Sequence, residues 1–281
     1  MARRSFGNSA MPAILIYLGL AVGLVFAAFP IVWMLFTSFK SNSEIFALPP
    51  RLLPEVFTLE AYTAIFADPV KLRFFLNSYL VAGAVTALTV LIAVITAYAF
   101  SRFQFRFKNT LNVFIISTQT VPPITLLIPY FGMVVAFGIF NTYFALILTY
   151  MVFTLPYAIL LMTGYLNTLP RELDEAVQID GGSSWTALWR VIVPLSVPGI
   201  VATSVYTFLL CWNEFLFALT LTKSMEMRTV PIGIEMLMGQ HAFEWNQMMA
   251  MSVLGSLPLL ILYLIAQRYF LAGMTAGSVK S

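Results

Sequence analysis

Six long apolar runs, separated by segments that hold most of the charges, divide this chain. A helix needs about 20 apolar residues to cross a bilayer, and each run is long enough. The runs cover residues 14–36, 77–100, 111–135, 142–164, 198–221 and 247–266. The sequence is 60% hydrophobic and 10% charged, whereas about 25% of the residues of a soluble domain are charged. We therefore expect an all-α, polytopic membrane protein with six transmembrane helices.

Lysine and arginine are shared unevenly between the two alternating sets of loops. The set that includes both termini carries Arg3, Arg4, Arg102, Arg106, Lys108, Arg171, Arg190, Arg268 and Lys280. The other set, within 40–75 and 223–246, has fewer, and cytoplasmic loops are the ones enriched in basic residues. We therefore expect both termini in the cytoplasm and the segments 40–75 and 223–246 outside, the first as an ordered loop with short helices.

The loops also suggest a division of the chain into two parts. Residues 1–76 would hold the N-terminal tail, the first transmembrane helix and an exterior loop. Residues 77–281 would form a core of five transmembrane helices with a cytoplasmic C-terminal tail.

The composition argues against most catalytic chemistry. Cys211 and His241 are the only residues of their types, too few for a zinc site or a nucleophilic triad. No lysine follows a glycine, so the sequence lacks the phosphate-binding loop of ATPases. The basic residues are not interleaved with aromatic residues, which argues against nucleic-acid binding. We expect no catalytic residue, no metal site and no cofactor bound by this chain.

The segment 166–198 is the longest polar run in the second half of the sequence. Its apolar stripe has the spacing of a helix and consists of Leu169, Leu173, Ala176 and Val177. Pro170 is expected in the first turn of this helix, where a missing N–H is tolerated. Gly181 and Gly182 should end it, because glycine readily adopts left-handed conformations.

A second helix should follow the two glycines. Ser183 or Ser184 can cap its first turn, and Pro194 is expected to end it. The segment would then be a helix, a sharp bend and a second helix. From the residues alone, an ordinary amphipathic surface loop is the alternative.

A family signature lies in this segment. Glu175-Ala176-Val177, then Gly181, then residues 191–194 (VIVP) stand at the spacing E-A-A-x3-G-x9-I-x-L-P. This resembles the EAA signature of ABC-importer permeases, with conservative changes at 177, 191 and 193. The resemblance implies a type I importer core of the MetI-like kind, with 166–198 as the cytoplasmic coupling loop. The residues that it assigns to ATPase coupling are Glu175, Ala176, Asp180, Gly181 and Pro194, and we expect Glu175 to anchor the loop by a polar contact.

The resemblance also implies partners and a location. Two copies of a cytoplasmic ATP-binding subunit would bind ATP and magnesium and drive transport. A second permease subunit would complete the pathway, usually as a heterodimer, and an extracytoplasmic binding protein would deliver the substrate. The protein would lie in the lipid bilayer of a bacterial cytoplasmic (inner) membrane.

Two further strings resemble the carbohydrate subgroup of these permeases. Residues 212–219 read WNEFLFAL, and residues 271–280 read LAGMTAGSVK, which is similar to the ending of maltose-type, MalG-like permeases. Together they imply a sugar or oligosaccharide substrate.

Four polar residues are candidates for the translocation pathway: Gln119, Tyr130, Asn213 and Glu214. The first two flank a proline-rich part of the third run, where Pro122, Pro123 and Pro129 should break the helix. Such a break is tolerated in a membrane only where protein or a water-filled cavity satisfies the freed carbonyls. A sugar needs hydroxyl partners and an aromatic ring over its C–H face. The alternative is that these polar side chains join helices to one another.

Glu214 is the one acid within the six runs. A carboxylate in a membrane is costly unless it faces a partner or water. It would line the pathway or act as a hydrogen-bond anchor between helices. An ion-coupled secondary transporter that uses Glu214 is the alternative function.

The segment 223–246 contains Met236, Met238 and His241. The family resemblance implies that this exterior loop contacts the binding protein. A lid packed on its own helices is the alternative.

Overall fold

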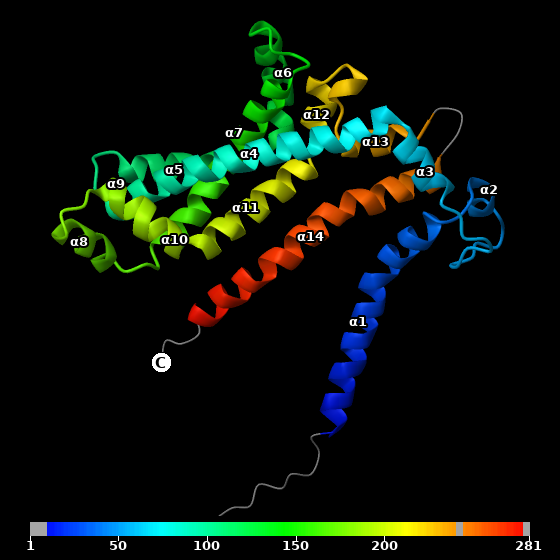
Figure 1. Ribbon diagram of the computed structural model, residues 1–281, viewed down its shortest axis with the longest axis horizontal. Helices are drawn as coiled ribbons and strands as arrows, with labels where there is room; N and C mark the ends of the chain where they lie inside the picture. The colour runs from blue at the N-terminus through cyan, green and yellow to red at the C-terminus, as the bar shows by residue number, and fades with distance from the viewer. Residues whose placement is uncertain (1–9, 240–243, 278–281) are drawn as a thin grey trace, which may run out of the picture. The chain divides into compact units, whose positions relative to one another are not determined.

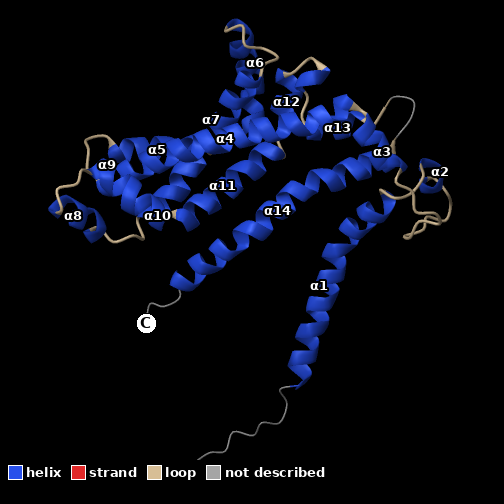
Figure 2. Cartoon of the chain, in the orientation of Figure 1, coloured by secondary structure: helices blue, strands red, loops and turns tan. Residues whose placement is uncertain are grey.

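The computed structural model describes residues 10–239 and 244–277 of the 281-residue chain, which form helices and no β-strand (Figures 1 and 2). The α-helices are α1 (Ala10–Thr37), α2 (Asn42–Ile45), α3 (Glu60–Ala67), α4 (Pro69–Arg102), α5 (Lys108–Thr118), α6 (Leu127–Ala136), α7 (Tyr143–Leu166), α8 (Glu172–Ile179), α9 (Ser184–Ala187), α10 (Val193–Leu195), α11 (Val197–Trp212), α12 (Leu216–Leu221), α13 (Val230–Met236) and α14 (Trp245–Gly277). Pro123–Leu126 (η1) and Met225–Met227 (η3) are 3-10 turns, and Leu188–Ile192 (η2) is a π-helical turn.

Four helices in the described residues are long and apolar enough to cross a membrane: α1, α4, α7 and α14. Two further pairs meet the same test but are bent. One pair is α5 with Pro123–Ala136, bent by 93°, and the other is Ser184–Leu195 with α11, bent by 76°. Counting each bent pair as one span gives six, the number that the sequence predicts.

The third apolar run is broken where its prolines predicted a break. Helix α5 ends at Thr118, and Pro122 and Pro123 lead into the turn η1 before α6 begins. The fifth run is also broken, because α11 ends at Trp212 and α12 begins only at Leu216. No proline or glycine at residues 213–215 predicts this second break.

Helix α4 begins before the expected residue 77. Asp68 caps it by accepting a hydrogen bond from the N–H of Val70 at 2.9 Å, and Pro69 occupies the first turn. The predicted division of the chain at residues 76 and 77 falls inside this helix and stays a prediction.

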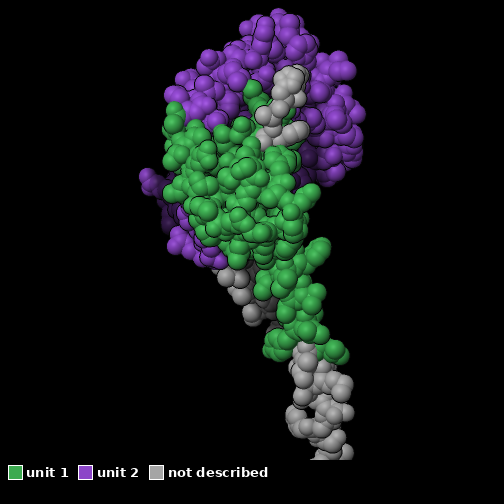
Figure 3. Space-filling view, turned by 90° about the vertical axis from the view of Figure 1, so that its right-hand side faces the viewer, with its two compact units in different colours: residues 1–67, 236–254 green, residues 68–235, 255–281 purple. Residues whose placement is uncertain are grey.

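The chain splits into two compact units, which are described separately (Figure 3). The first comprises residues 1–67 and 236–254, and the second comprises residues 68–235 and 255–281. In the first unit the segment after α1 is ordered, as predicted. The Ser38 and Tyr62 hydroxyls lie 2.7 Å apart, and the buried Lys40 donates to the carbonyl of Arg51.

In the second unit α4 packs along α7 and α11 (Figure 1). Small residues allow the close approach, since Ala93, Ala97 and Ala158 are fully buried. Met162, Leu188 and other apolar side chains extend this core to the segment 184–192. The packing therefore joins the long helices of this unit to the polar segment that carries the family signature.

Candidate functional site

The first helix of the polar segment 166–198 is α8. It begins at Glu172, so Pro170 precedes the helix and does not occupy its first turn as expected. The first turn holds Glu172, Asp174 and Glu175, whose negative charges favour the positive end of the helix dipole. The acidic residues thus stabilise the start of α8 whether or not they contact a partner.

The bend after α8 has the geometry that its two glycines predict. Gly181 has a φ of +80°, the left-handed region. The N–H of Gly182 donates to the carbonyl of Val177 at 2.8 Å, and the N–H of Gly181 donates to that of Gln178 at 3.0 Å. These two bonds are those of a Schellman cap. A Cβ atom on Gly182 would lie 2.6 Å from Cγ1 of Val177. Both glycines are therefore required by the shape of the bend.

The second helix of the segment begins with a cap by Ser183, whose Oγ accepts from the N–H of Thr186 at 3.2 Å. It continues through the π-helical turn η2 and α10 to Leu195, so the prediction that Pro194 ends it is wrong. Pro194 lies in the first turn of α10, where its missing N–H is tolerated. The chain bends after Leu195, at Ser196.

The anchor of α8 is Asp174 and not Glu175. Asp174 is 7% exposed; its Oδ1 accepts from the hydroxyl of Tyr98 at 2.6 Å, and its Oδ2 from Nε of Arg102 at 2.7 Å. Glu175 is exposed, and its side chain has no hydrogen-bond partner within the described part of the chain. Successive residues of a helix are turned by about 100°, so a side chain next to the one that faces α4 points elsewhere. The polar contact that was expected at Glu175 is therefore made by Asp174, one residue before it.

Arg102 also holds the end of α7. Its Nη2 donates to the carbonyls of Leu169 at 3.2 Å and Pro170 at 3.4 Å, and its Nη1 donates to that of Leu166 at 3.4 Å. A cation there stabilises the free carbonyls at a helix C-terminus. One guanidinium group therefore joins α4, the end of α7 and α8.

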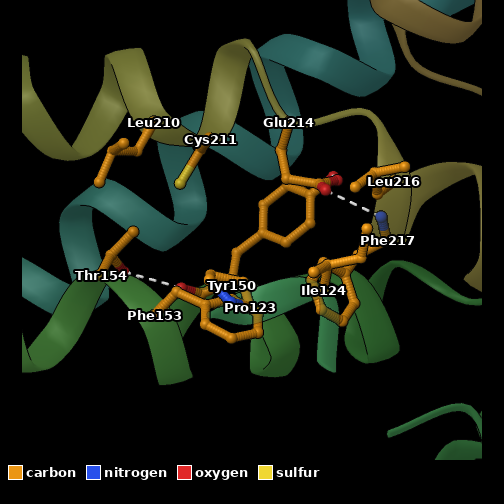
Figure 4. A pocket seen from close by; sticks show the side chains of 10 residues that line it. All are labelled: Pro123, Ile124, Tyr150, Phe153, Thr154, Leu210, Cys211, Glu214, Leu216 and Phe217. Atoms are coloured by element: carbon orange, nitrogen blue, oxygen red, sulfur yellow. Dashed lines mark hydrogen bonds between the residues drawn. The ribbon is translucent and has the colours of Figure 1, made fainter. Parts of the chain in front are cut away.

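The two helix breaks meet at a cavity of about 190 Å³ in the second unit (Figure 4). The break in the third run, α7, α11 and the break in the fifth run all contribute to its wall. The lining residues are Pro123, Ile124, Tyr150, Phe153, Thr154, Leu210, Cys211, Glu214, Leu216 and Phe217.

Glu214 stands at the polar end of this cavity and caps α12. Its carboxylate accepts from the N–H groups of Phe217 at 2.8 Å and Ala218 at 3.0 Å, and from the hydroxyl of Tyr150 at 2.7 Å. A carboxylate with these three donors is compensated without a counter-ion. Glu214 therefore makes the hydrogen bonds expected of an anchor between helices, and it also lines the cavity. Asn213 is exposed and donates to the carbonyl of Leu209 in its own helix, so it does not join Glu214.

A second cavity, of about 430 Å³, brings Gln119 and Tyr130 together. Its other lining residues are Thr118, Val121, Pro123, Leu126, Val152, Phe153, Tyr206 and Leu210. The Tyr130 ring packs edge-on against Phe217 with centroids 6.0 Å apart. Sequence reasoning missed Tyr206, whose ring is stacked on that of Tyr157 at 4.4 Å. No pattern in the sequence distinguishes these two tyrosines from the other aromatic residues of the apolar runs.

Of the expected binding-protein contacts, Met236 and Met238 are 38% and 49% exposed. Met236 is the last residue of α13. His241 lies outside the described residues.

The whole chain resembles known membrane transport proteins. Residues 72–276 match the family model described as the binding-protein-dependent transport system inner membrane component. The permease protein SmoH of a sulfoquinovosyl glycerol transport system in Agrobacterium fabrum is 37% identical over 94% of this chain and 93% of its own length. MalG of the trehalose/maltose transport system of Thermococcus litoralis is 36% identical over 95% of this chain and 96% of its own.

The fold is also similar to that of a solved structure. A chain of a bacterial ABC transporter involved in the import of the acidic polysaccharide alginate superposes with a TM-score of 0.83 at 19% sequence identity. The match covers 96% of this chain and 100% of that chain.

Proposed function

The chain belongs to the family of inner membrane components of binding-protein-dependent transport systems, and from this we propose that it carries a carbohydrate across the bacterial cytoplasmic membrane. It is a transport permease and not an enzyme, as the names of its relatives also say. The two relatives described above belong to transport systems for sulfoquinovosyl glycerol and for trehalose and maltose, which supports a sugar or a sugar derivative as the substrate.

ATP hydrolysis in separate subunits drives this transport. Two copies of an ATP-binding subunit would bind ATP and magnesium on the cytoplasmic side, where both termini of this chain would also lie. The observation that carries the proposal is the surface of α8. Ile179 is 86% exposed at its end, beside the exposed Ala176 and Glu175. We infer that this exposed apolar side chain and the polar residues around it form the surface on which the ATP-binding subunit docks.

Gly181 and Pro194 fix the shape of that surface. The cap at Gly181, directly after the C-cap residue Asp180, sets the direction in which the chain leaves α8. Pro194 lies in the helix that leads from the bend to α11. A loop that transmits a movement of the ATPase must be stiff, and the capped bend and the buried Asp174 supply that stiffness.

The substrate would pass along the cavities beside the two helix breaks. Gln119 and Tyr130 would contact it, because an amide and an aromatic ring together suit the hydroxyl groups and the C–H face of a sugar. Glu214 would hold the fifth span in shape next to that path. A second permease subunit, in a heterodimer, would enclose the other half of the pathway.

The exterior loop would receive the extracytoplasmic binding protein. The exposed side chains of Met236 and Met238 supply apolar contact area, and His241 would lie in the same loop. Methionine is well suited to such a surface, because its flexible side chain adapts to a partner.

An ion-coupled transporter that uses Glu214 is the less favoured function. Proton coupling by one carboxylate requires that the group change its protonation state during transport. Here the carboxylate accepts hydrogen bonds from two backbone N–H groups and a tyrosine hydroxyl, which gives it a structural role at the start of α12.

A pull-down of the ATPase subunit tests the docking surface. We expect the wild-type chain, solubilised with its partners, to retain a tagged ATP-binding subunit, and Ile179→Asp to lose it. Val56→Asp, which changes an apolar residue that is 71% exposed in the segment 40–75, far from α8 in the sequence, serves as the matched change. Equal retention of the subunit by Ile179→Asp and by wild type would contradict the docking surface.

A further inference from the structure

Helix α4 is the one long helix of the described chain that has no proline in its interior. It is 34 residues long, and its one proline, Pro69, is at its start. The other long helices of the described chain have an internal proline, at Pro30, Pro156 and Pro258. The remaining two spans are bent or broken. An unbroken helix is the stiffest element that this part of the chain offers.

The N-terminal end of α4 holds the loop between α12 and α13. Asn77 is 2% exposed, and its Nδ2 donates to the carbonyls of Glu226 at 2.8 Å and Arg228 at 2.7 Å. Its Oδ1 accepts from the hydroxyl of Tyr143 at 2.7 Å. The side-chain amide is therefore fully engaged, and it fixes the turn η3 to α4.

Two neighbouring contacts strengthen this attachment. The buried Ser78 accepts a hydrogen bond from the N–H of Val230, at the start of α13, with a length of 2.9 Å. Gly233 lies so close to Phe74 that a Cβ atom would be 2.3 Å from the phenyl ring. The loop and α13 thus follow the start of α4 with little freedom of their own.

The C-terminal end of α4 holds α8 in the same way. Tyr98 and Arg102 both bind the buried carboxylate of Asp174. Between Asn77 and Arg102 the helix rises by about 38 Å, at 1.5 Å a residue, which exceeds the hydrocarbon thickness of a bilayer. One helix therefore has buried polar attachments to a loop on each side of the membrane.

We propose that α4 transmits a movement of the exterior loop 222–230, caused by the binding protein when it docks there, to the coupling helix α8. Asn77 and Asp174 are the positioning residues at the two ends of α4. The inference rests on the proposed function and adds a route to it. A movement of the loop displaces Asn77, and α4 moves together with α7, because Asn77 binds Tyr143 and Arg102 binds the carbonyl of Leu166. Asp174 then carries α8 with these helices. Coupling of this kind needs an element that both sites bias, and α4 is attached to both.

The test is ATP hydrolysis by the whole complex in lipid, with and without binding protein loaded with trehalose, maltose or sulfoquinovosyl glycerol. We expect Asn77→Ala and Asp174→Asn each to reduce the stimulation at least fivefold and to leave basal hydrolysis within about twofold of wild type. Asn109→Ala and Glu172→Gln change an exposed asparagine and an exposed acidic residue and should behave as wild type. Both substitutions interrupt one route. The double variant should therefore be stimulated no less than the more impaired of the two single variants.

Two milder variants guard against a failure to assemble. Tyr143→Phe removes one hydrogen bond from Asn77, and Tyr98→Phe removes one from Asp174. Each should reduce the stimulation about twofold with normal amounts of all subunits.

Amide hydrogen exchange supplies a readout that a merely structural role would not change. In wild type, the loaded binding protein should alter the amide exchange rates of residues 172–182. In Asn77→Ala this response should be lost, while the exchange rates measured without binding protein should equal those of wild type. Wild-type stimulation that persists in both single variants would overturn the α4 route and leave the proposed function standing. Absence of stimulation in wild type would overturn both.

Discussion

Asp174 and Arg102 form a buried ion pair, with Oδ2 of the acid 2.7 Å from Nε of the arginine and their side chains 10% and 7% exposed. The two residues belong to elements far apart in the sequence, α8 and the end of α4. The pair is completed by the hydroxyl of Tyr98 and by carbonyl groups after α7. The polar segment is therefore attached to the helical core by a charge pair and not only by its apolar stripe.

Removal of the acid should be strongly destabilising. In Asp174→Ala, the guanidinium of Arg102 stays buried without its partner, and loss of one member of a buried pair costs about 3 kcal/mol. The free energy of unfolding in detergent, followed by circular dichroism, should fall by that order. Glu172→Ala removes an exposed acid from the same helix and should change it by less than about 0.5 kcal/mol. Equal effects of the two substitutions would contradict the buried pair.

The bend should not accept a β-branched residue. Gly181 has a φ of +80°, where such a side chain is strongly disfavoured, so Gly181→Val should change the direction of α8. We expect sugar uptake by cells to fall at least tenfold while the amount of protein in the membrane is unchanged. Gly164→Val, in α7 at a position with no heavy atom within 4 Å of an added Cβ, is the matched change. Normal uptake by Gly181→Val at a normal protein level would count against a stiff coupling loop.

Glu214 should prove to be structural. Glu214→Gln replaces an acceptor by an amide that cannot receive all three donors, and loss of a bond to a charged group costs about 1.5–3 kcal/mol. The variant should be less stable by that order and transport more slowly, but its uptake should keep the pH profile of wild type. The measurement is the rate of uptake between pH 5.5 and 8. Proton coupling through Glu214 would require that the uptake rate of the variant no longer depend on pH, and that result would contradict the structural role.

Tyr130 should contribute to substrate passage through its ring. An aromatic contact is worth about 0.5–1.5 kcal/mol, so Tyr130→Ala should reduce uptake roughly two- to tenfold and Tyr130→Phe much less. Tyr263, a tyrosine of α14 that is 56% exposed, provides the control substitution Tyr263→Ala. If the two alanine variants transport equally well, the cavity beside the third-span break is not on the pathway.

The sequence predicted the elements that depend on local chemistry. Apolar length predicted the spans, Pro122 and Pro123 predicted the broken third run, and Gly181 predicted the left-handed end of α8. Each of these follows from one property of a residue and its neighbours: hydrophobicity, a missing donor or a missing Cβ.

Contacts between distant segments could not be predicted in the same way. Arg102 is one of three basic residues that follow the second apolar run, and nothing in the sequence distinguishes it from Arg106 and Lys108 as the partner of Asp174. The error over Glu175 arose because adjacent acids on a helix have the same local chemistry, and only the packing of α8 on α4 decides which one is buried. Asn77 was missed because an asparagine early in a long apolar run gives no sign of what it binds.

Transport driven by ATP is the central claim, and uptake into proteoliposomes tests it most directly. The complete complex would be reconstituted with loaded binding protein outside and ATP on the side of the ATP-binding subunits, with radiolabelled trehalose, maltose or sulfoquinovosyl glycerol as substrate. We predict uptake that requires both ATP and binding protein and persists when ionophores abolish all ion gradients. Uptake that needs no ATP and disappears with a proton or sodium gradient would contradict the account.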